Sequence, residues 1–388
     1  MPVKDFEYLG DKDIYLDAAC QSMRPQPVID ALVEYYTNYN ACGGRAKYKW
    51  GLRTDDRVNE TRGLVLKWLK LSSRDYFVSF TLNTTYGLNL ILSQLRQDVV
   101  RKVMTSEIEH NSPFLSTMTF AEEAGVEREV MERMEDGSID LSAYDFTGAL
   151  VVVNCASNVD GRKLGNIREL VKAVHKAGGI VVIDAAQAMA HSSDVLWKTE
   201  ADAICFSAHK MYAPSLGVMV VRKDLAPKMQ TSFIGGGMVD DVTRDEYVLS
   251  ADSPNNIHTK FEAGLQAWGE IIGFGAALKW LDKLPKEAHR RLERNVAKMY
   301  EFLSENPKIV LINAQPNPTM SFYVEGLDSH LLGGALGDAG LMVRTGYFCV
   351  HYYLDHVKGY PPLVRFSMGY HNSEEDIDRA IDILRKVC

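Results

Sequence analysis

Short apolar runs alternate along this chain with segments that have the periodicity of a helix. Residues 149–154 form one continuous apolar run, residues 168–177 show an amphipathic helical pattern that stops at two glycines, and residues 180–184 form the next apolar run. Further runs that fit buried strands lie at 76–81, 100–104, 203–207 and 217–221. Strands that alternate with helices in this way predict an α/β fold, with a mostly parallel sheet covered by helices.

The pattern changes after Gly264, where long helical segments precede short strands. The helical segments cover residues 267–284 and 287–306, and a last helix is expected at 373–387. Strands are expected between them at 320–324, 341–344 and 363–367. This mixture of elements is typical of a smaller α+β domain.

Length and pattern together predict two domains. A chain of 388 residues can bury a large core and exceeds the usual size of one domain. We expect a large α/β domain at residues 17–270. The smaller α+β domain is expected to combine residues 1–16 with residues 271–388.

Charge and composition exclude several classes of function. The net charge of −8 argues against a general nucleic-acid surface, because such surfaces are basic. No apolar run approaches the length of a membrane span, and the first residues lack the charged-then-apolar layout of a signal peptide. The six cysteines are scattered, without the paired spacing of a zinc site. We therefore expect a cytoplasmic protein with reduced thiols, no metal, no nucleic-acid partner and no membrane partner.

One aspartate and one lysine each follow an apolar run. Asp184 ends the run at 180–184, and Lys210 follows Ser207 and His209 just after the run at 203–207. Open α/β sheets bind ligands at the carboxyl ends of their strands. A lysine there can form a Schiff base with an aldehyde cofactor, and a carboxylate can keep a pyridine nitrogen protonated. The pair points to pyridoxal 5'-phosphate, although an aspartate after a strand also caps helices and most lysines are surface cations.

Several motifs in a fixed order resemble one known group of enzymes. They run from Tyr15-Leu-Asp-Ala-Ala-Cys-Gln-Ser-Met-Arg-Pro through Phe206-Ser-Ala-His-Lys-Met to Val364-Arg-Phe-Ser, and so span nearly the whole chain. The chain resembles the fold-type I pyridoxal-phosphate enzymes of the class V aminotransferase superfamily, and within it the group II cysteine desulfurases. The resemblance implies pyridoxal 5'-phosphate as cofactor and a homodimer whose active sites lie near the interface.

The resemblance assigns roles around the cofactor ring. Lys210 resembles the lysine that carries the cofactor, Asp184 the partner of the pyridinium nitrogen, and Gln187 the side chain that hydrogen-bonds the ring hydroxyl. His110 resembles the histidine that stacks on the ring, although on its own it would fit a surface loop. Lys210 and His110 are therefore expected to take part in catalysis.

The cofactor's phosphate needs donors, which a strand-to-helix turn supplies through its free N–H groups. The turn Asn83-Thr84-Thr85 resembles the family's phosphate-binding turn, with Thr85 as the favoured hydroxyl donor. Ser207 and His209 resemble further phosphate ligands. Plain helix capping would explain Thr84 and Thr85 as well.

Three more residues resemble the family's substrate contacts. Arg365 resembles the arginine that binds the α-carboxylate, a task that suits a guanidinium group. Asn158 resembles the asparagine near cofactor and substrate, and Arg344 resembles a second arginine on the substrate side. A surface ion pair is the commoner fate of an arginine taken alone.

Cys349 decides which reaction the resemblance implies, because a pyridoxal enzyme needs no thiol to transaminate, racemise or eliminate. Residues 343–349 resemble the loop that carries the nucleophile in group II desulfurases. With L-cysteine as substrate, Lys210 removes the α-proton and the Cys349 thiolate attacks the substrate sulfur, giving alanine and a persulfide on Cys349. Arg344 or His351 could favour the thiolate, whereas a buried Cys349 would be inert. The sulfur would pass to an acceptor protein, for iron–sulfur clusters or another thiolated product.

The sequence departs from the family pattern at two places. Group II desulfurases usually have two histidines directly before the cysteine, where this chain has Tyr347 and Phe348. The family commonly has a threonine after a glycine to reach the neighbouring subunit's phosphate, where this chain has Leu265 followed by Gln266. Gln266 could take over that bond, or the phosphate has one ligand fewer.

Other activities of the same superfamily remain open. A selenocysteine lyase or a cysteine/cystine C–S lyase would share the fold and the cofactor. In a class V aminotransferase, an epimerase or a kynureninase-like enzyme, Cys349 would be incidental. A cofactor-binding scaffold without catalysis fits least, because Lys210, Asp184, Gln187 and His110 are all present.

Overall fold

The computed structural model describes residues 3–10, 13–44, 46–252 and 256–387, and a seven-stranded sheet forms its centre. The strand order is β2-β8-β7-β6-β5-β3-β4. All neighbours are parallel except β8, which runs antiparallel to both β2 and β7. The prediction of a mostly parallel sheet is confirmed. The strands are β2 (Tyr76–Thr81), β3 (Lys102–Ser106), β4 (Glu127–Met131), β5 (Ala149–Asn154), β6 (Ile180–Asp184), β7 (Ala203–Ser207) and β8 (Gly217–Arg222).

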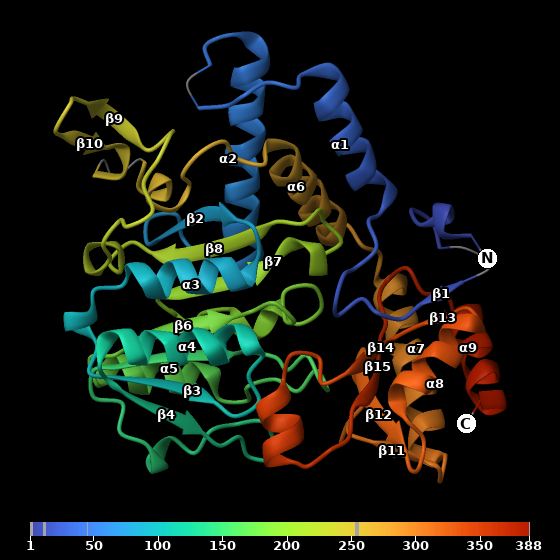
Figure 1. Cartoon of the computed structure of the whole chain (residues 1–388). Helices are drawn as coiled ribbons and strands as arrows, with labels where there is room; N and C mark the ends of the chain where they lie inside the picture. Colours follow the sequence, from blue (N-terminus) through green and yellow to red (C-terminus); the bar gives the residue numbers. More distant parts are fainter. Residues whose placement is uncertain (1–2, 11–12, 45, 253–255, 388) are drawn as a thin grey trace.

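Both faces of this sheet are buried, which explains why its central strands are apolar at every position. Val151 and Val153 pack into one hydrophobic cluster, and Leu150 and Val152 pack into the other, because successive side chains of a strand point to opposite faces. Helices α3 (Thr84–Gln94) and α4 (Asn111–Ala124) cover the second face. Helices α2 (Lys49–Leu69) and α5 (Ile167–Lys176) cover the first (Figure 1).

The parallel strands bring polar residues to one edge of the sheet. Strands β5, β6 and β7 end at Asn154, Asp184 and Ser207. Because β8 is antiparallel to both β7 and β2, strand β2 is parallel to β7 and also ends at this edge. The turn after β2 leads into α3, so the start of that helix lies beside the other strand ends.

A second, antiparallel sheet lies to one side of the large one, at the right of Figure 1, and has the order β11-β12-β15-β14. Helices α7, α8 and α9 belong to the same part of the chain. This arrangement agrees with the predicted smaller α+β region, whereas the domain boundaries at residues 16 and 270 stay a prediction. The elements are β11 (Ile309–Leu311), β12 (Thr319–Val324), β14 (Arg344–Gly346), β15 (Leu363–Ser367), α7 (Lys286–Glu305), α8 (Ser329–Asp338) and α9 (Glu374–Val387).

The strand predicted at 341–344 is in fact two strands. β13 (Leu341–Met342) pairs in parallel with β1 (Ile14–Tyr15), whereas β14 pairs with β15. The chain therefore leaves one sheet and enters the other at Val343. The beginning of the chain is thereby attached to its last third, and Asp17 forms a bridge to Ser367.

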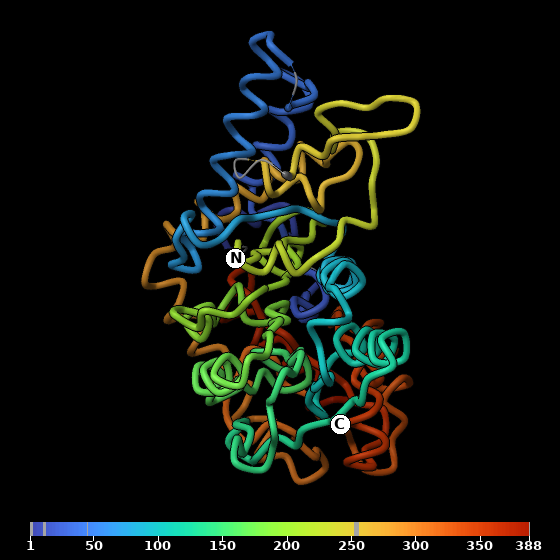
Figure 2. Tube along the Cα trace, turned by 90° about the vertical axis from the view of Figure 1, so that its left-hand side faces the viewer, coloured from blue at the N-terminus to red at the C-terminus, as the bar shows by residue number. Residues whose placement is uncertain are grey.

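The remaining elements lie above the large sheet in Figure 1. Helix α6 (Trp268–Asp282) packs against α1 (Gln26–Asn38) and against α2. The hairpin of β9 (Val239–Val242) and β10 (Tyr247–Leu249) projects from the body of the molecule, as Figure 2 shows. In the part of the chain that the structure describes, no helix has the length and apolarity that a bilayer crossing requires.

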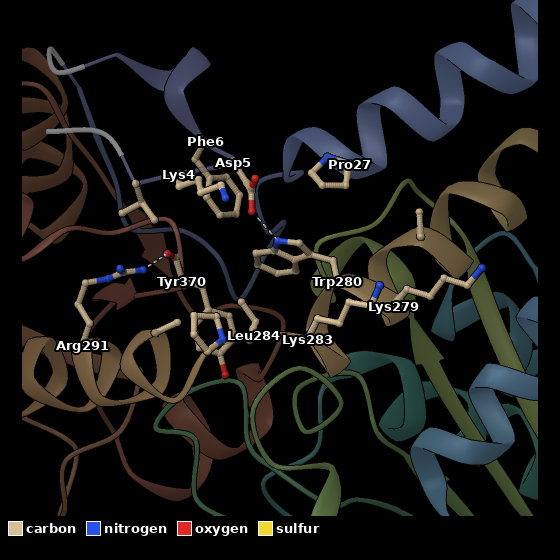
Figure 3. Close-up of a pocket in the computed structure, with 14 residues that line it drawn as sticks. Lys4, Asp5, Phe6, Pro27, Lys279, Trp280, Lys283, Leu284, Arg291 and Tyr370 are labelled. Atoms are coloured by element: carbon tan, nitrogen blue, oxygen red, sulfur yellow. Dashed lines mark hydrogen bonds between the residues drawn. The ribbon is translucent and has the colours of Figure 1, made fainter.

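The segment before β1 docks against α6 and the start of α7 (Figure 3). Phe6 is fully buried and packs edge-on against Trp280, whose Nε1 donates to Oδ2 of Asp5 over 3.0 Å. Arg291 donates to the carbonyl of Tyr370 over 2.8 Å on the opposite wall. A largely apolar cavity of about 520 Å³ lies between these walls.

Candidate active site

A cavity of about 340 Å³ opens at the edge of the large sheet where the parallel strands end, facing β14 and β15 of the small sheet. The twelve residues that the sequence predicts as cofactor, substrate or catalytic residues all border it, whereas His351 and Gln266 do not. The twelve come from the ends of strands in the large sheet, from the starts of α3 and α4, and from the region of β14 and β15 in the small sheet. They are Thr84, Thr85, His110, Asn158, Asp184, Gln187, Ser207, His209, Lys210, Arg344, Cys349 and Arg365.

Lys210 and Asp184 enter the cavity from adjacent strands. Asp184 ends β6 and is buried, and Lys210 closes a short 3-10 turn (Ala208–Lys210) directly after β7. Burial raises the pKa of Asp184, against the Ala186 N–H that donates to its Oδ1 over 2.9 Å and against the charge of Lys210. Burial lowers the pKa of Lys210, and Asp184 opposes this shift. The lysine is therefore easier to deprotonate than a surface lysine.

The start of α3 carries an arrangement suited to an anion. Thr84 donates its N–H to Oγ of Ser207 over 3.0 Å, and the two hydroxyls lie 2.6 Å apart. Thr85 Oγ1 lies 2.6 Å from Oγ of Ser112. The helix is capped by Asn83, whose Oδ1 accepts the N–H of Tyr86 over 2.9 Å, so capping does not explain the two threonines. Hydroxyls beside a helix N-terminus form a favourable phosphate site.

Two histidines of the cavity are held neutral. Burial lowers the pKa of His110 to about 4, and Lys210 and Arg365 lower it further. Its Nδ1 accepts the N–H of Ser112 over 3.1 Å and thereby caps α4, which fixes the ring at the cavity wall. Burial likewise lowers the pKa of His209 to about 4. Neutral rings at pH 7 can stack on a flat ligand or accept a proton without adding charge.

The residues of the cavity fit the cofactor that the sequence implies. Nδ1 of His209 and Nε of Arg365 are buried without a hydrogen-bond partner among the described residues. An unpartnered buried polar atom costs about 1–3 kcal/mol, so these atoms are expected to bond a ligand. An amine, a carboxylate and a group of hydroxyls at a helix N-terminus match the aldehyde, ring nitrogen and phosphate of pyridoxal 5'-phosphate.

The two arginines share a carboxylate that sequence reasoning did not assign. Arg344 Nη2 lies 2.7 Å from Oδ2 of Asp17, and Arg365 Nη2 lies 3.1 Å from its Oδ1. Arg365 also donates to the carbonyl of Asn158 over 3.0 Å. The Arg365 side chain is 4% exposed and that of Arg344 is 46% exposed, so the former is fixed and the latter faces solvent. Two guanidinium groups against one carboxylate leave a net positive site for a substrate carboxylate.

Cys349 lies on an exposed loop over the cavity. Its carbonyl accepts the N–H of Asn111 over 2.6 Å, and Asn158 Nδ2 donates to the carbonyl of Phe348 over 2.8 Å. Phe348 and Cys349 have φ angles of 50° and 59°. Non-glycine residues rarely adopt such angles, so the contacts from the start of α4 and from the segment after β5 hold the loop in a strained form.

The structure shows the contacts of Phe348 and Gln266 and the exposure of Leu265, three residues at which the sequence departs from the family pattern. Phe348 is buried, packs with Val350 and Leu363, and lies under the Arg365 guanidinium at 4.7 Å from the ring centre. It therefore anchors the loop where the family has a histidine. Leu265 is 78% exposed, and Gln266 Nε2 donates to the carbonyls of Ala263 and Gly264.

Asp17, Cys20, Ser112 and Asn154 belong to the site, and sequence reasoning gave none of them a role. Cys20, Ser112 and Asn154 border the cavity directly. A signal existed for Asn154 because it ends the apolar run of β5, as Asp184 ends that of β6. Asp17 and Cys20 follow only a two-residue strand, so no periodic pattern marked them.

The sequence matches a known family over nearly its full length. The model of the family described as Aminotransferase class-V matches residues 14–380. A probable cysteine desulfurase of Methanothermobacter thermautotrophicus is 31% identical over 400 residues, which cover 99% of this chain and 97% of the relative. A cysteine desulfurase of Pectobacterium atrosepticum is 28% identical over 396 residues, which cover 100% of this chain and 96% of the relative.

Solved structures show the same fold. The apo cysteine desulfurase from Thermococcus onnurineus NA1 superposes with a TM-score of 0.85 at 28% identity, over 96% of this chain and 94% of its own. A cysteine desulfurase of Escherichia coli gives a TM-score of 0.88 over 99% of this chain and 96% of its own, and at 22% identity this shows the fold alone. The fold is thus that of the fold-type I pyridoxal-phosphate enzymes. The chain belongs to the aminotransferase class V family.

Proposed function

We propose that the protein is a pyridoxal-phosphate-dependent cysteine desulfurase, which converts L-cysteine to L-alanine and leaves a persulfide on Cys349. The observation that carries the proposal is the position of Cys349 on the same cavity as Lys210, Asp184 and Arg365. Transamination or racemisation would need the last three and no thiol. Full-length relatives named cysteine desulfurase support the same reaction.

In this proposal the cofactor is held by residues of the large sheet. Lys210 holds it covalently, Asp184 faces the ring nitrogen, Gln187 faces the ring hydroxyl and His110 covers the ring. Thr84, Thr85, Ser207 and His209 bind the phosphate. Bound there, the cofactor supplies an electron sink that makes the α-proton of an amino acid acidic.

The substrate is oriented by charge. Arg365 and Arg344 bind the α-carboxylate, and the buried Arg365 fixes its position because it is held by Asp17 and Asn158. Asn158 also supports the loop of Cys349 through the carbonyl of Phe348, and this support links substrate binding to the nucleophile.

The chain's own groups then move a proton and a sulfur atom. Nζ of Lys210 takes the α-proton, and its lowered pKa favours the neutral amine that this step requires. The Cys349 thiolate attacks the substrate sulfur, so that an S–S bond forms while the substrate C–S bond breaks. The electron pair of the broken bond stays with the substrate carbon, which takes up a proton to become alanine.

Replacing the thiol tests this function. We expect Cys349→Ser to bind pyridoxal phosphate with an unchanged visible spectrum and to lose sulfide and alanine formation from L-cysteine by at least a hundredfold, since the nucleophile is removed. Cys42→Ser, on an exposed loop outside the cavity, serves as control. Full activity of Cys349→Ser would overturn the proposal, and alanine formed from selenocysteine by that variant would identify a selenocysteine lyase instead.

The proposal includes a homodimer. Exposed apolar side chains gather on the β9–β10 hairpin and the neighbouring segments, including Phe233, Val242, Val248 and Leu265. Gly264 donates its N–H to the carbonyl of Gly236 over 2.7 Å, so the Leu265 segment and the hairpin base are joined. Apolar groups exposed together in this way are typical of protein interfaces. Light scattering would show a mass of one chain if the dimer does not form.

The destination of the sulfur is part of the same proposal. We assign the persulfide to a sulfur-acceptor protein, for iron–sulfur cluster assembly or another thiolated product, because Cys349 is exposed to a partner. The five described cysteines are free, which suits a reducing compartment such as the cytoplasm.

A further inference from the structure

A second thiol borders the cavity that contains Cys349. Cys20 lies five residues after the end of β1, comes from the opposite end of the chain and borders the same space. The other described cysteines do not border it. Cys155 and Cys205 are buried, and Cys42 lies on a separate exposed surface. Among the described residues, the site therefore holds one exposed and one half-buried sulfur.

Cys20 is held in a defined position. Its N–H donates to the carbonyl of Asp17 over 3.0 Å, and the carbonyl of the preceding residue, Ala19, accepts from Gln187 Nε2 over 2.9 Å. Ser367 Oγ accepts the N–H of Ala19 over 2.8 Å. Backbone contacts to both sheets thus fix the turn that carries the sulfur.

A guanidinium group lies directly against this sulfur. Arg344 Nη2 is 2.7 Å from Cys20 Sγ and also 2.7 Å from Oδ2 of Asp17, so the carboxylate holds the cation beside the thiol. A guanidinium group binds anionic groups through charge-assisted hydrogen bonds. The buried Arg365, whose Nε has no hydrogen-bond partner in the described part of the chain, borders the same space and adds further positive charge.

Cys20 and Cys349 border the same cavity as the amine of Lys210. Burial is the main cause of the lowered pKa of Lys210, and after the effects of Asp184 and Arg365 come those of Cys20 and Cys349, which both oppose it. The positions of the two thiols and Lys210 on one cavity do not depend on these pKa effects. A sulfur atom delivered to Cys349 is thus bound in a cavity that a second thiol also borders.

We propose that Cys20 is a second sulfur-carrying residue, which takes the outer sulfur atom from the persulfide on Cys349. This inference rests on the proposed function. The Cys20 thiolate attacks the outer sulfur of Cys349–S–SH, a new S–S bond forms at Cys20, and the old S–S bond breaks with Cys349 leaving as thiolate. The exchange consumes no oxidant or reductant and is reversible. It transfers the sulfur from an exposed site to a half-buried one.

The relay changes how much sulfur one chain can hold. Once the sulfur has moved to Cys20, the Cys349 thiolate is free for a second molecule of L-cysteine. Without an external thiol to remove the sulfur, one chain would then form two molecules of alanine before it stops. A chain limited to Cys349 would form one.

The test measures the burst of alanine and locates the sulfur. The holoenzyme is mixed with about three equivalents of L-cysteine per chain and no other thiol, and is quenched at early times, before free L-cysteine removes the persulfide sulfur. It is then alkylated, digested with trypsin and analysed by mass spectrometry. We expect about two alanines per wild-type chain, about one for Cys20→Ser and none for Cys349→Ser. A Cys42→Ser background is used throughout, because Cys20 and Cys42 share one tryptic peptide. The peptide of Cys20 should carry a persulfide that appears after the one on the peptide of Cys349.

Any one of several results would overturn the relay. Among them are a burst of one alanine in the wild type, an equal burst in Cys20→Ser, a persulfide on Cys20 in the Cys349→Ser variant, and a Cys20–Cys349 disulfide with free sulfide. The disulfide would show that Cys20 resolves the persulfide rather than storing its sulfur. Alanine formed with sulfur on Cys349 alone would reject the relay and leave the desulfurase proposal intact. No alanine from any variant would reject both.

Discussion

Two cavities of this protein differ in how far the polar groups of their walls have hydrogen-bond partners. The larger, of about 520 Å³, lies between the N-terminal segment and helices α6 and α7 (Figure 3). Three of its polar side chains have partners: Trp280 bonds Asp5, Arg291 bonds the carbonyl of Tyr370, and Lys279 pairs with Glu60 over 2.6 Å. The smaller, of about 340 Å³, has buried nitrogens of His209 and Arg365 without hydrogen-bond partners among the residues that the structure describes.

The difference teaches that volume alone does not locate a reactive site. The hydrogen bonds of Trp280 and Arg291 around the larger cavity hold elements together, because they join α6 to the N-terminal segment and α7 to the residues after β15. The smaller cavity collects titratable groups with shifted pKa values, which cost stability unless a ligand uses them. We therefore expect changes in the first region to affect folding and changes in the second to affect chemistry.

Lys210→Ala should have the largest effect and would show that chemistry resides in the smaller cavity. We expect turnover of L-cysteine to fall on the order of a thousandfold or more, because both the cofactor anchor and the proton acceptor are lost. The visible absorbance of the bound cofactor should disappear, and the thermal midpoint of the cofactor-free proteins should change little. A variant that keeps its visible band and its rate would contradict the assignment.

Trp280→Ala tests whether the residues around the larger cavity stabilise the fold. Its ring packs against Phe6 at 5.7 Å and Tyr212 at 5.1 Å, and its Nε1 bonds Asp5. We expect the free energy of unfolding, measured in urea, to fall by about 3 kcal/mol, because a large aromatic side chain is removed from a packed contact. kcat/KM at low temperature should change by less than about twofold, whereas a large loss of activity without loss of stability would place a functional site there.

The control for this variant lies on the same wall. Lys283 borders the larger cavity and is exposed. Lys283→Ala should change the free energy of unfolding by no more than about 0.5 kcal/mol, as is usual for an exposed surface position.

Arg365→Lys sharpens the comparison within the smaller cavity. Lysine keeps the charge but loses the paired geometry of the guanidinium, and hydrogen bonds to charged groups contribute about 1.5–3 kcal/mol. We expect kcat/KM for L-cysteine to fall roughly 10- to 150-fold, mostly through KM. Arg344→Lys is the matched variant and should lose less, because Arg344 is 46% exposed against 4% for Arg365. Equal losses would contradict the ranking of the two arginines.

Protonation of His371, which packs near the larger cavity, should have a smaller effect, on the pH dependence of stability. His371 packs against Phe6, and burial lowers its pKa from 6.5 to about 4, opposed by the bond to the Tyr15 carbonyl and by Asp376. As the pH falls from about 6.5 towards 4, the unfolded chain binds a proton that the folded protein does not bind. Stability therefore falls by up to about 1.4 kcal/mol per pH unit.

The variant His371→Gln checks this sign. Glutamine can still donate to the Tyr15 carbonyl and has no proton to gain. We expect the thermal midpoint to drop less between pH 7 and pH 5 in this variant than in the wild type. An identical drop would show that His371 does not titrate in this range.

Much of the fold could be predicted from local patterns. The apolar runs at 149–154 and 180–184 coincide with β5 and β6, and the helices expected at 267–284 and 287–306 begin and end within two residues of α6 and α7. These elements were predictable because both faces of the central strands are buried, and long helices keep one periodic apolar face. The prediction of one strand at 341–344 was wrong because the two halves of this run pair with strands of different sheets. The partner of a strand cannot be predicted from so short a run.

The candidate site was predictable only where a residue followed a strong pattern or matched a motif. Asp184 and Lys210 directly follow long apolar runs, so their shared edge could be foreseen. Asp17 and Cys20 could not be foreseen, since β1 has two residues and its partner is more than 300 positions away. The role of Asp17 between Arg344 and Arg365 exists only once β1 joins β13.

The sequence by itself therefore determined the order of elements, the family and the chemical character of the main site residues. Periodicity, apolar runs and the positions of Asp184 and Lys210 are local properties of the chain, so they can be recognised in the sequence alone. Only the tertiary structure decided that Arg344 is held between a carboxylate and a second thiol, and that Phe348 anchors the loop of Cys349. Those relations join residues from distant parts of the chain, and packing alone brings them within bonding distance.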